Sequence, residues 1–110
     1  MNAEKNNTNT SRNSKSKQFR FWILTIPHHH FMPFLPPTVL HIAGQLESGV
    51  STSYLHWQLV VTFEAKRTMR QVKELFGDMV HCEPTRSMAA RKYCFKKDTQ
   101  VTGTQFELGE

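Results

Sequence analysis

A histidine and a glutamine two residues apart are the side chains in this sequence best suited to chemistry. His56 and Gln58 lie in residues 54–63, YLHWQLVVTF, which are rich in β-branched and aromatic types and lack Gly and Pro. This composition predicts a β-strand. Side chains alternate between the faces of a strand, so the imidazole and the carboxamide share a face, about 7 Å apart. The other face is an apolar row that predicts burial: Leu55, Trp57, Leu59, Val61 and Phe63.

A carboxylate precedes this pair at a distance that a hairpin can close. Residues 39–47, VLHIAGQLE, predict a second strand, and the Ser- and Gly-rich residues 48–53 predict the turn between the two strands. Glu47 then returns toward His56 and Gln58. Carboxylate, imidazole and amide together suit Mg²⁺ or Mn²⁺ with positions left for water and phosphate. A structural zinc site is not indicated, because no cysteine pair has the required spacing. The alternative is a solvated turn carboxylate and a lone surface histidine.

A phenol and an ammonium lie three residues apart near the C-terminus. Residues 84–97, PTRSMAARKYCFKK, predict a helix, on which Tyr93 and Lys96 share one face. A tyrosine hydroxyl can act as a nucleophile when a neighbouring group activates it. The same two side chains are ordinary surface chemistry in most proteins. They gain meaning here because a face suited to a metal is predicted elsewhere in the chain.

The remaining elements complete an α+β fold. Residues 19–26 predict a strand that is apolar on both faces, which is typical of a central strand. The proline- and histidine-rich connection 28–38 excludes a long helix, and its apolar side chains are expected to cover the edge of the core. An amphipathic helix is predicted over 65–76 and a further strand over 79–83. Residues 99–108 predict a final strand or a hairpin around Gly103. We therefore predict an antiparallel sheet of about five strands with two helices on one face, in a ferredoxin-like or RRM-like arrangement.

Length and composition predict one intracellular domain. The chain has 110 residues and a formal net charge of +5, which favours a nucleic acid or another polyanion as partner. Residues 1–17 are polar and basic and predict a flexible tail, so the folded domain, residues 18–110, carries less of that charge. The two cysteines, Cys82 and Cys94, are expected to be reduced and buried. No apolar run is long enough to span a membrane.

Three short motifs in this order resemble those of a known family. Residues 22–27 read WILTIP, residues 56–58 read HWQ and residues 93–96 read YCFK. These resemble, respectively, the first motif, the metal motif and the Tyr-x-x-Lys nucleophile motif of rolling-circle replication initiators. The resemblance is to the HUH endonuclease domain of Rep proteins from circular Rep-encoding single-stranded DNA viruses. It covers about residues 18–110.

The resemblance implies a divalent metal site on the sheet. In such a domain Glu47, His56 and Gln58 would hold Mn²⁺ or Mg²⁺. The first-motif residues would support the fold or contact DNA, and the residues that read the DNA sequence stay unassigned. This chain departs from related domains in the connection 28–38, which lacks the helix often found between the first two strands.

The resemblance also implies a reaction. Tyr93 would attack single-stranded DNA at a viral origin stem-loop, with Lys96 assisting and Asp98 as an auxiliary acid. A 5′-phosphotyrosine would form and leave a 3′-hydroxyl that primes replication, and the reverse reaction would rejoin ends. A host-nuclear location is implied, as is a helicase domain beyond Glu110 through which the full-length protein would self-associate. The alternatives are a non-catalytic RRM-like binder of single strands, and a metal-dependent hydrolase in which water attacks.

Overall fold

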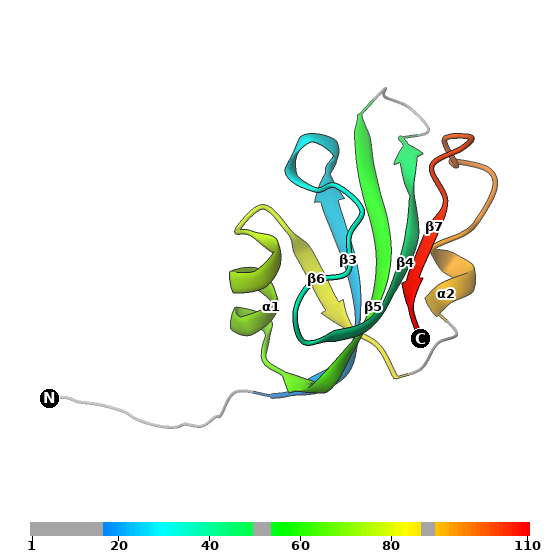
Figure 1. Cartoon of the computed structure of the whole chain (residues 1–110). Coiled ribbons are helices and arrows are strands. Elements are labelled where there is room, and N and C mark those ends of the chain that lie inside the picture. Colours follow the sequence, from blue (N-terminus) through cyan, green and yellow to red (C-terminus); the bar gives the residue numbers. More distant parts are fainter. Residues whose placement is uncertain (1–16, 50–53, 87–89) are drawn as a thin grey trace, which may run out of the picture.

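A five-stranded antiparallel sheet forms the body of the protein. The computed structural model describes residues 17–49, 54–86 and 90–110, and its strands follow the order β6-β3-β5-β4-β7 (Figure 1). The strands are β3 (Phe19–Pro27), β4 (Val39–Ser48), β5 (Leu55–Arg67), β6 (His81–Pro84) and β7 (Phe106–Gly109). All four pairings are antiparallel, and β5 lies at the centre. The predicted α+β class and the sheet of about five strands are confirmed. The predicted tail, apart from Lys17, lies outside the described residues.

Strands β4 and β5 form the expected hairpin. Their register places Ile42 opposite Val61, Gly44 opposite Leu59 and Glu47 opposite His56. A Cβ added to Gly44 would lie 2.1 Å from the carbonyl oxygen of Gln58, so the two strands can approach this closely only at a glycine. The turn residues 50–53 lie outside the described residues.

The first long helix is shorter than predicted because β5 continues further. Residues 65–67, predicted as the start of a helix, extend β5, where Arg67 pairs with Phe19. Just before them, the Glu64 amide donates to the carbonyl of Thr38. Helix α1 spans Met69–Phe76. A capping box fixes its start: the Gln71 amide donates to the Thr68 hydroxyl, and the Gln71 side chain accepts from the Thr68 amide.

The second predicted helix is also much shorter. Of residues 84–97, only Ala90–Tyr93 form helix α2, while Pro84 belongs to β6 and residues 87–89 lie outside the described residues. The Thr85 amide extends β6 by donating to Phe21 on β3. After Tyr93 the chain turns and returns to β4, so Lys96 is not helical.

The two outer strands also differ from prediction. The strand predicted over 79–83 begins two residues later as β6, which pairs with β3. A final strand or a hairpin around Gly103 is predicted over residues 99–108. These residues contain an isolated bridge between Gln100 and Glu47 and most of the short strand β7, which pairs with β4. The residues between Gln100 and β7 include a turn, in which the Thr104 amide donates to the carbonyl of Val101.

One face of the sheet carries the main hydrophobic core, and α1 covers it. Val72 and Phe76 of α1 pack onto it, and the ring of Phe31 lies 5.8 Å from that of Trp57 and 6.2 Å from that of Phe76. We call this the core face. Its buried strand residues are Trp22, Leu24, Ile26, Val39, Ile42, Leu46, Trp57, Leu59, Val61, Phe63 and Cys82.

The opposite face carries a second, smaller cluster beneath α2. Ala43, Val60 and Cys94 are buried there, with Ile23 and Phe95 packed against them. Because strand residues alternate between faces, Val60 points away from its core-face neighbours on β5. The prediction that both helices cover one face is therefore wrong. Both faces of the central strand carry apolar residues, so each face needs a cover.

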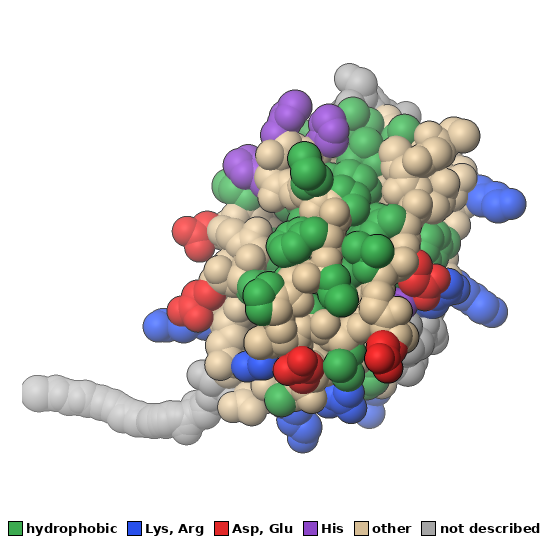
Figure 2. Space-filling model, in the orientation of Figure 1, with side chains coloured by type: hydrophobic (Ala, Val, Ile, Leu, Met, Phe, Trp, Pro, Cys, Tyr) green, Lys and Arg blue, Asp and Glu red, His purple; other side chains and the backbone are tan. Residues whose placement is uncertain are grey.

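The connection between β3 and β4 starts with a short 3-10 helix, η2 (His28–His30), and then runs over the core face. Of its apolar side chains, Phe31 packs on the core as expected, whereas Met32, Phe34 and Leu35 are 78%, 48% and 43% exposed. Figure 2 shows hydrophobic side chains gathered on the face turned to the viewer. Among the described residues, no helix has the length and apolar character needed to cross a membrane.

Candidate functional site

The face opposite the main core carries the predicted metal-binding residues; we call it the site face. Glu47 and His56 are cross-strand partners there, and Glu47 Oε1 lies 3.6 Å from His56 Nε2. The Glu47 side chain is almost fully buried, and that of His56 is 18% exposed. The sheet register therefore holds a carboxylate and an imidazole side by side, as the predicted hairpin requires.

Gln58 lies next along the same row, and its amide is oriented by β3. Its Nε2 donates to the carbonyl of Leu24 at 3.1 Å, and its Oε1 accepts from the Thr25 hydroxyl at 3.3 Å. An amide oxygen has two lone pairs, so Oε1 retains one for another partner. The three side chains predicted to bind metal thus share one face of two adjacent strands.

Gln45 is a central residue of this site that the sequence analysis did not identify. It is fully buried and lies opposite Gln58 in the hairpin. Its Nε2 donates to Glu47 Oε2 at 3.2 Å and to the carbonyl of Lys96 at 2.7 Å, while its Oε1 accepts from Gln100 at 2.8 Å. Gln45 therefore fixes the Glu47 carboxylate and the segment after Tyr93 against each other. The only sequence signal for it was its place in the same alternating row as Glu47.

Tyr93, at the end of α2, opens onto the site face. It lines a pocket of about 230 Å³ together with Thr25, Gln58 and three other residues, Ile23, His81 and Glu83. Its side chain is half exposed. Lys96 Nζ lies 4.6 Å from the centre of the Tyr93 ring. The two predicted partners are together, but a turn rather than a helical face brings them there.

The thiol beside the tyrosine is chemically inert. Cys94 is fully buried, and burial raises its pKa to about 12, with the Glu47 carboxylate adding to the rise and Lys96 opposing it. Only the thiolate is a good nucleophile, so Cys94 stays protonated near neutral pH. Cys82 is likewise buried and free, and its pKa is raised chiefly by burial. Tyr93 is therefore the nucleophile candidate in this segment.

A histidine and a glutamate on β6 form the far wall of the tyrosine pocket. His81 and Glu83 lie opposite Thr25 and Ile23 in the sheet, and their side chains approach to 2.8 Å. Neither residue was predicted to have a role in the site. Alternation along the short strand would have placed both on one face, but the sequence does not show which strand they pair with.

Asp98 does not join the other predicted residues. It is exposed, in the turn that follows Lys96. Among the described residues it forms no hydrogen bond or ion pair, unlike Glu47, whose two oxygens face Gln45 and His56. Its auxiliary role stays a prediction to which the geometry adds nothing.

The residues present fit a divalent cation. A buried carboxylate is costly unless a positive charge compensates it, and Glu47 has only an amide and an imidazole as partners in the described part of the chain. Adjacent ligands of a six-coordinate ion with bonds of about 2.1 Å lie about 3 Å apart. The separation of 3.6 Å between Glu47 and His56 is a small side-chain rotation from that value. No cluster of three His, Cys, Asp or Glu occurs among the described residues, because the third predicted ligand is the amide of Gln58.

A second polar chain ties α2 to the edge of the sheet. Glu107 on β7 is hydrogen-bonded to His41 on β4 at 2.6 Å and forms an ion pair with Arg91 on α2. The Arg91 guanidinium first, and then His41, lower the pKa of Glu107 to about 2. Because Arg91 lies two residues before Tyr93, this chain helps to fix the helix that presents the tyrosine.

Comparison with known proteins identifies no family for this chain. No protein-family model matches the chain, and no curated protein matches it. The resemblance to rolling-circle initiators therefore rests on the three sequence motifs.

Proposed function

We propose that this protein is a metal-dependent enzyme that nicks and rejoins single-stranded DNA through a tyrosine and initiates rolling-circle replication of a circular genome. One observation carries the proposal. Glu47, His56 and Gln58 share one face of the sheet, and Tyr93, from a segment more than thirty residues away, opens onto a pocket that Gln58 also lines. A nucleophile beside a set of metal ligands is the arrangement that phosphodiester transfer needs.

Glu47, His56 and Gln58 would hold the divalent ion. When bound, this ion would supply positive charge that neutralises a non-bridging oxygen of the phosphate and fixes its position. Gln45 holds one oxygen of Glu47, which leaves the other oxygen on the side of His56. Thr25 and Leu24 orient the amide of Gln58 in the same way.

Tyr93 carries the covalent step. Its hydroxyl oxygen attacks phosphorus, a Tyr–O–P bond forms, and the bond from phosphorus to the 3′ oxygen breaks. The phenol gives up its proton, and the leaving 3′ oxygen takes up a proton to become a hydroxyl. The number of phosphoester bonds is unchanged, so the reverse reaction rejoins the strand without another energy source.

Lys96 stabilises the negative charge that develops on the tyrosine and on the phosphate. Its ammonium lies over the Tyr93 ring, at 4.6 Å from the ring centre. Its backbone carbonyl is held by the buried Gln45. The lysine is therefore positioned by the same residue that positions a metal ligand.

The test is capture of a covalent adduct. Labelled single-stranded oligonucleotides that carry candidate origin loops are incubated with the protein and Mn²⁺ or EDTA, and the products are separated on a denaturing gel. We expect a metal-dependent protein–DNA band that disappears in Tyr93→Phe. The matched control is Tyr54→Phe, which makes the same change at the other tyrosine of the chain. Phenylalanine retains the ring that stacks on His56, with ring centres 5.7 Å apart, so the band should remain.

The other outcomes point to different functions. Cleavage without an adduct, with Tyr93→Phe still active, would indicate a hydrolase in which water attacks. Tight binding of single strands without cleavage of any origin would indicate a non-catalytic, RRM-like binder.

A further inference from the structure

We propose that the end of the sheet where β3 begins binds the phosphate backbone of the single strand that flanks the nicking site. The residues that we assign to this surface are Arg20, Lys66 and Arg86, which we call the basic end. The inference rests on the proposed function for the identity of the strand. It adds a DNA-binding surface to a site whose DNA contacts were unassigned.

The basic end surrounds a pocket of its own. This pocket has a volume of about 520 Å³, and its lining combines the three cations with aromatic and polar residues: Gln18, Phe19, Arg20, Phe21, Lys66, Thr85 and Arg86. Cations around an aromatic floor are the composition of surfaces that bind single strands, because the cations contact phosphates and the rings stack on bases.

This pocket and the tyrosine pocket lie along one row of side chains. Phe21 lines the first, while Ile23 and Thr25, on the same face of β3, line the second. Phe21 and Thr25 are four positions apart in the strand, which corresponds to about 13 Å. A few nucleotides of an extended strand can span that length while one phosphate lies at Tyr93.

Of the three cations, Lys66 and Arg86 are available to a ligand, whereas Arg20 also donates to the carbonyl of Phe63 and lies over the ring of Phe21. All three side chains are exposed, and within residues 17–49, 54–86 and 90–110 no carboxylate forms an ion pair with any of them. Figure 2 shows several Lys and Arg side chains at the lower end of the molecule, where β3 begins in Figure 1, and others at its left and right edges.

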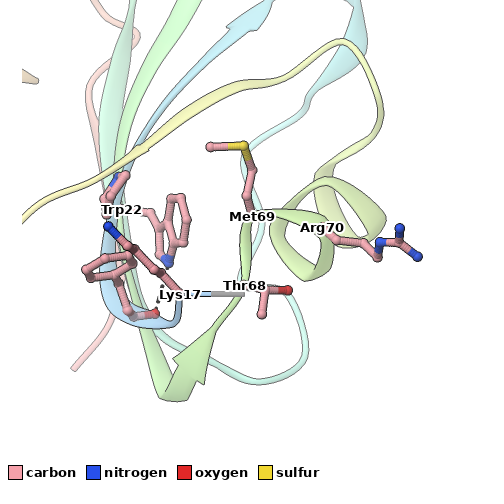
Figure 3. Close-up of a pocket in the computed structure, with 7 residues that line it drawn as sticks. Lys17, Trp22, Thr68, Met69 and Arg70 are labelled. Atoms are coloured by element: carbon pink, nitrogen blue, oxygen red, sulfur yellow. Dashed lines mark hydrogen bonds between the residues drawn. The ribbon is translucent and has the colours of Figure 1, made fainter. Parts of the chain in front are cut away.

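A second hollow lies beside the basic end. Figure 3 shows Lys17 beside Trp22 in this pocket of about 440 Å³, while Arg70 points away from it. Trp22 is only 1% exposed, and its Nε1 donates to the carbonyl of Phe19, so its ring offers little surface for stacking. Lys17 adds positive charge to the approach, but this hollow does not provide the base-stacking floor that Phe21 offers.

The experiment measures binding, so it does not depend on cleavage. Two fluorescent oligo-dT probes are titrated with the full chain in EDTA at several salt concentrations. One has about 2 nucleotides, too few to reach from Tyr93 to the basic end, and the other has about 12, within the usual range for single-strand sites. The double variant Lys66→Gln/Arg86→Gln removes two exposed cations and leaves Arg20, which also donates to the carbonyl of Phe63. The matched control, Lys73→Gln/Lys92→Gln, removes the same charge from α1 and α2.

The expected result follows from counterion release. Each phosphate contact makes the slope of log K against log salt concentration more negative by about 0.7. At 0.1 M salt, each contact therefore contributes about fivefold to the affinity. The double variant should therefore bind the longer oligonucleotide roughly 25-fold more weakly than the parent, with a slope shallower by about 1.4. It should bind the shorter one with little change. The control variant should gain as much affinity as the parent when the longer oligonucleotide replaces the shorter one.

Two outcomes would overturn the proposal. The first is an equal loss of affinity in both double variants, which would indicate non-specific attraction by net charge. The second is that Lys66→Gln/Arg86→Gln gains as much affinity as the parent from the shorter to the longer oligonucleotide, while its thermal unfolding midpoint equals that of the parent. The proposed nicking reaction is tested separately by the Tyr93 adduct, so either proposal can fail while the other stands.

Discussion

The two faces of the central strand use burial for opposite purposes. On the core face, Leu59 and Val61 pack in a continuous apolar cluster beneath α1. On the site face, Gln58 and Thr62 are also buried, but they are polar, and α2 covers only a small cluster around Val60. Adjacent residues of one strand therefore serve different ends, because alternation sends them to different environments.

The two kinds of burial place the apolar contacts that stabilise the sheet on one face and the candidate site on the other. Apolar burial is non-directional, so the core face can hold the sheet together with many interchangeable contacts. Buried polar groups need partners at hydrogen-bond distance, so each residue of the site face depends on a specific neighbour. Gln45 illustrates this, since it bonds to Glu47, Lys96 and Gln100 at once. Substitutions on the two faces should therefore differ in kind as well as in size.

The largest loss of stability is expected on the core face. Leu59 is fully buried in the main cluster, so Leu59→Ala should lower the free energy of unfolding by about 2–5 kcal/mol through lost burial and the cavity that remains. Val60→Ala, one residue away on the site face, should cost less, because fewer methyl groups are removed from a smaller cluster. Urea denaturation of both variants measures the difference. An equal or greater loss in Val60→Ala would contradict the assignment of the main core.

Removal of the buried carboxylate should abolish stabilisation by metal. At a Mn²⁺ concentration one hundred times its dissociation constant, the folded parent should gain about 2.7 kcal/mol, and Glu47→Gln should gain almost none. In EDTA the variant should be at least as stable as the parent, because a buried uncompensated charge has been removed. Thermal unfolding in EDTA and in MnCl₂ checks both expectations. Undiminished stabilisation of Glu47→Gln by Mn²⁺ would place the metal elsewhere.

Gln45 should have an intermediate effect on stability and a marked effect on the reaction. Gln45→Leu leaves the Lys96 carbonyl and one oxygen of Glu47 without their donor, which should cost about 1–3 kcal/mol. Adduct formation should also slow, because both halves of the site lose a common support. Chemical denaturation and a time course of the adduct provide the readouts. The control Gln105→Leu changes an exposed glutamine and should alter neither.

The smallest effect is expected at the edge of the sheet. The pKa of Glu107 is lowered from 4.5 to about 2 in the folded state. Its contribution to stability is therefore complete above pH 4.5 and is lost as the pH falls toward 2. Glu107 is 41% exposed, so Glu107→Gln should cost less than about 1 kcal/mol at pH 7. The difference from the parent should shrink at pH 3. Unfolding curves at both values test this, and a difference independent of pH would contradict it.

Much of the site could be predicted from local sequence. Alternation in residues 54–63 assigned His56 and Gln58 to one face, and the length of the turn brought Glu47 opposite His56. These features depend on neighbouring residues and one hairpin, so short-range patterns suffice. The position of Tyr93 relative to Gln58 could not be predicted in this way, because it depends on where the chain crosses the sheet after β6.

The order of residues along each strand is enough to predict which side chains share a face, because the period of two is a property of the backbone. Which elements cover those faces depends on long-range contacts that form only in the folded chain. Pairing with Phe19 kept Arg67 in β5 against a helical pattern, and the return of the chain to β4 ended α2 at Tyr93. The same return brought the Lys96 carbonyl within reach of Gln45. Long-range hydrogen bonds can outweigh a local helical preference of a few tenths of a kcal/mol per residue, and no local pattern records where they form.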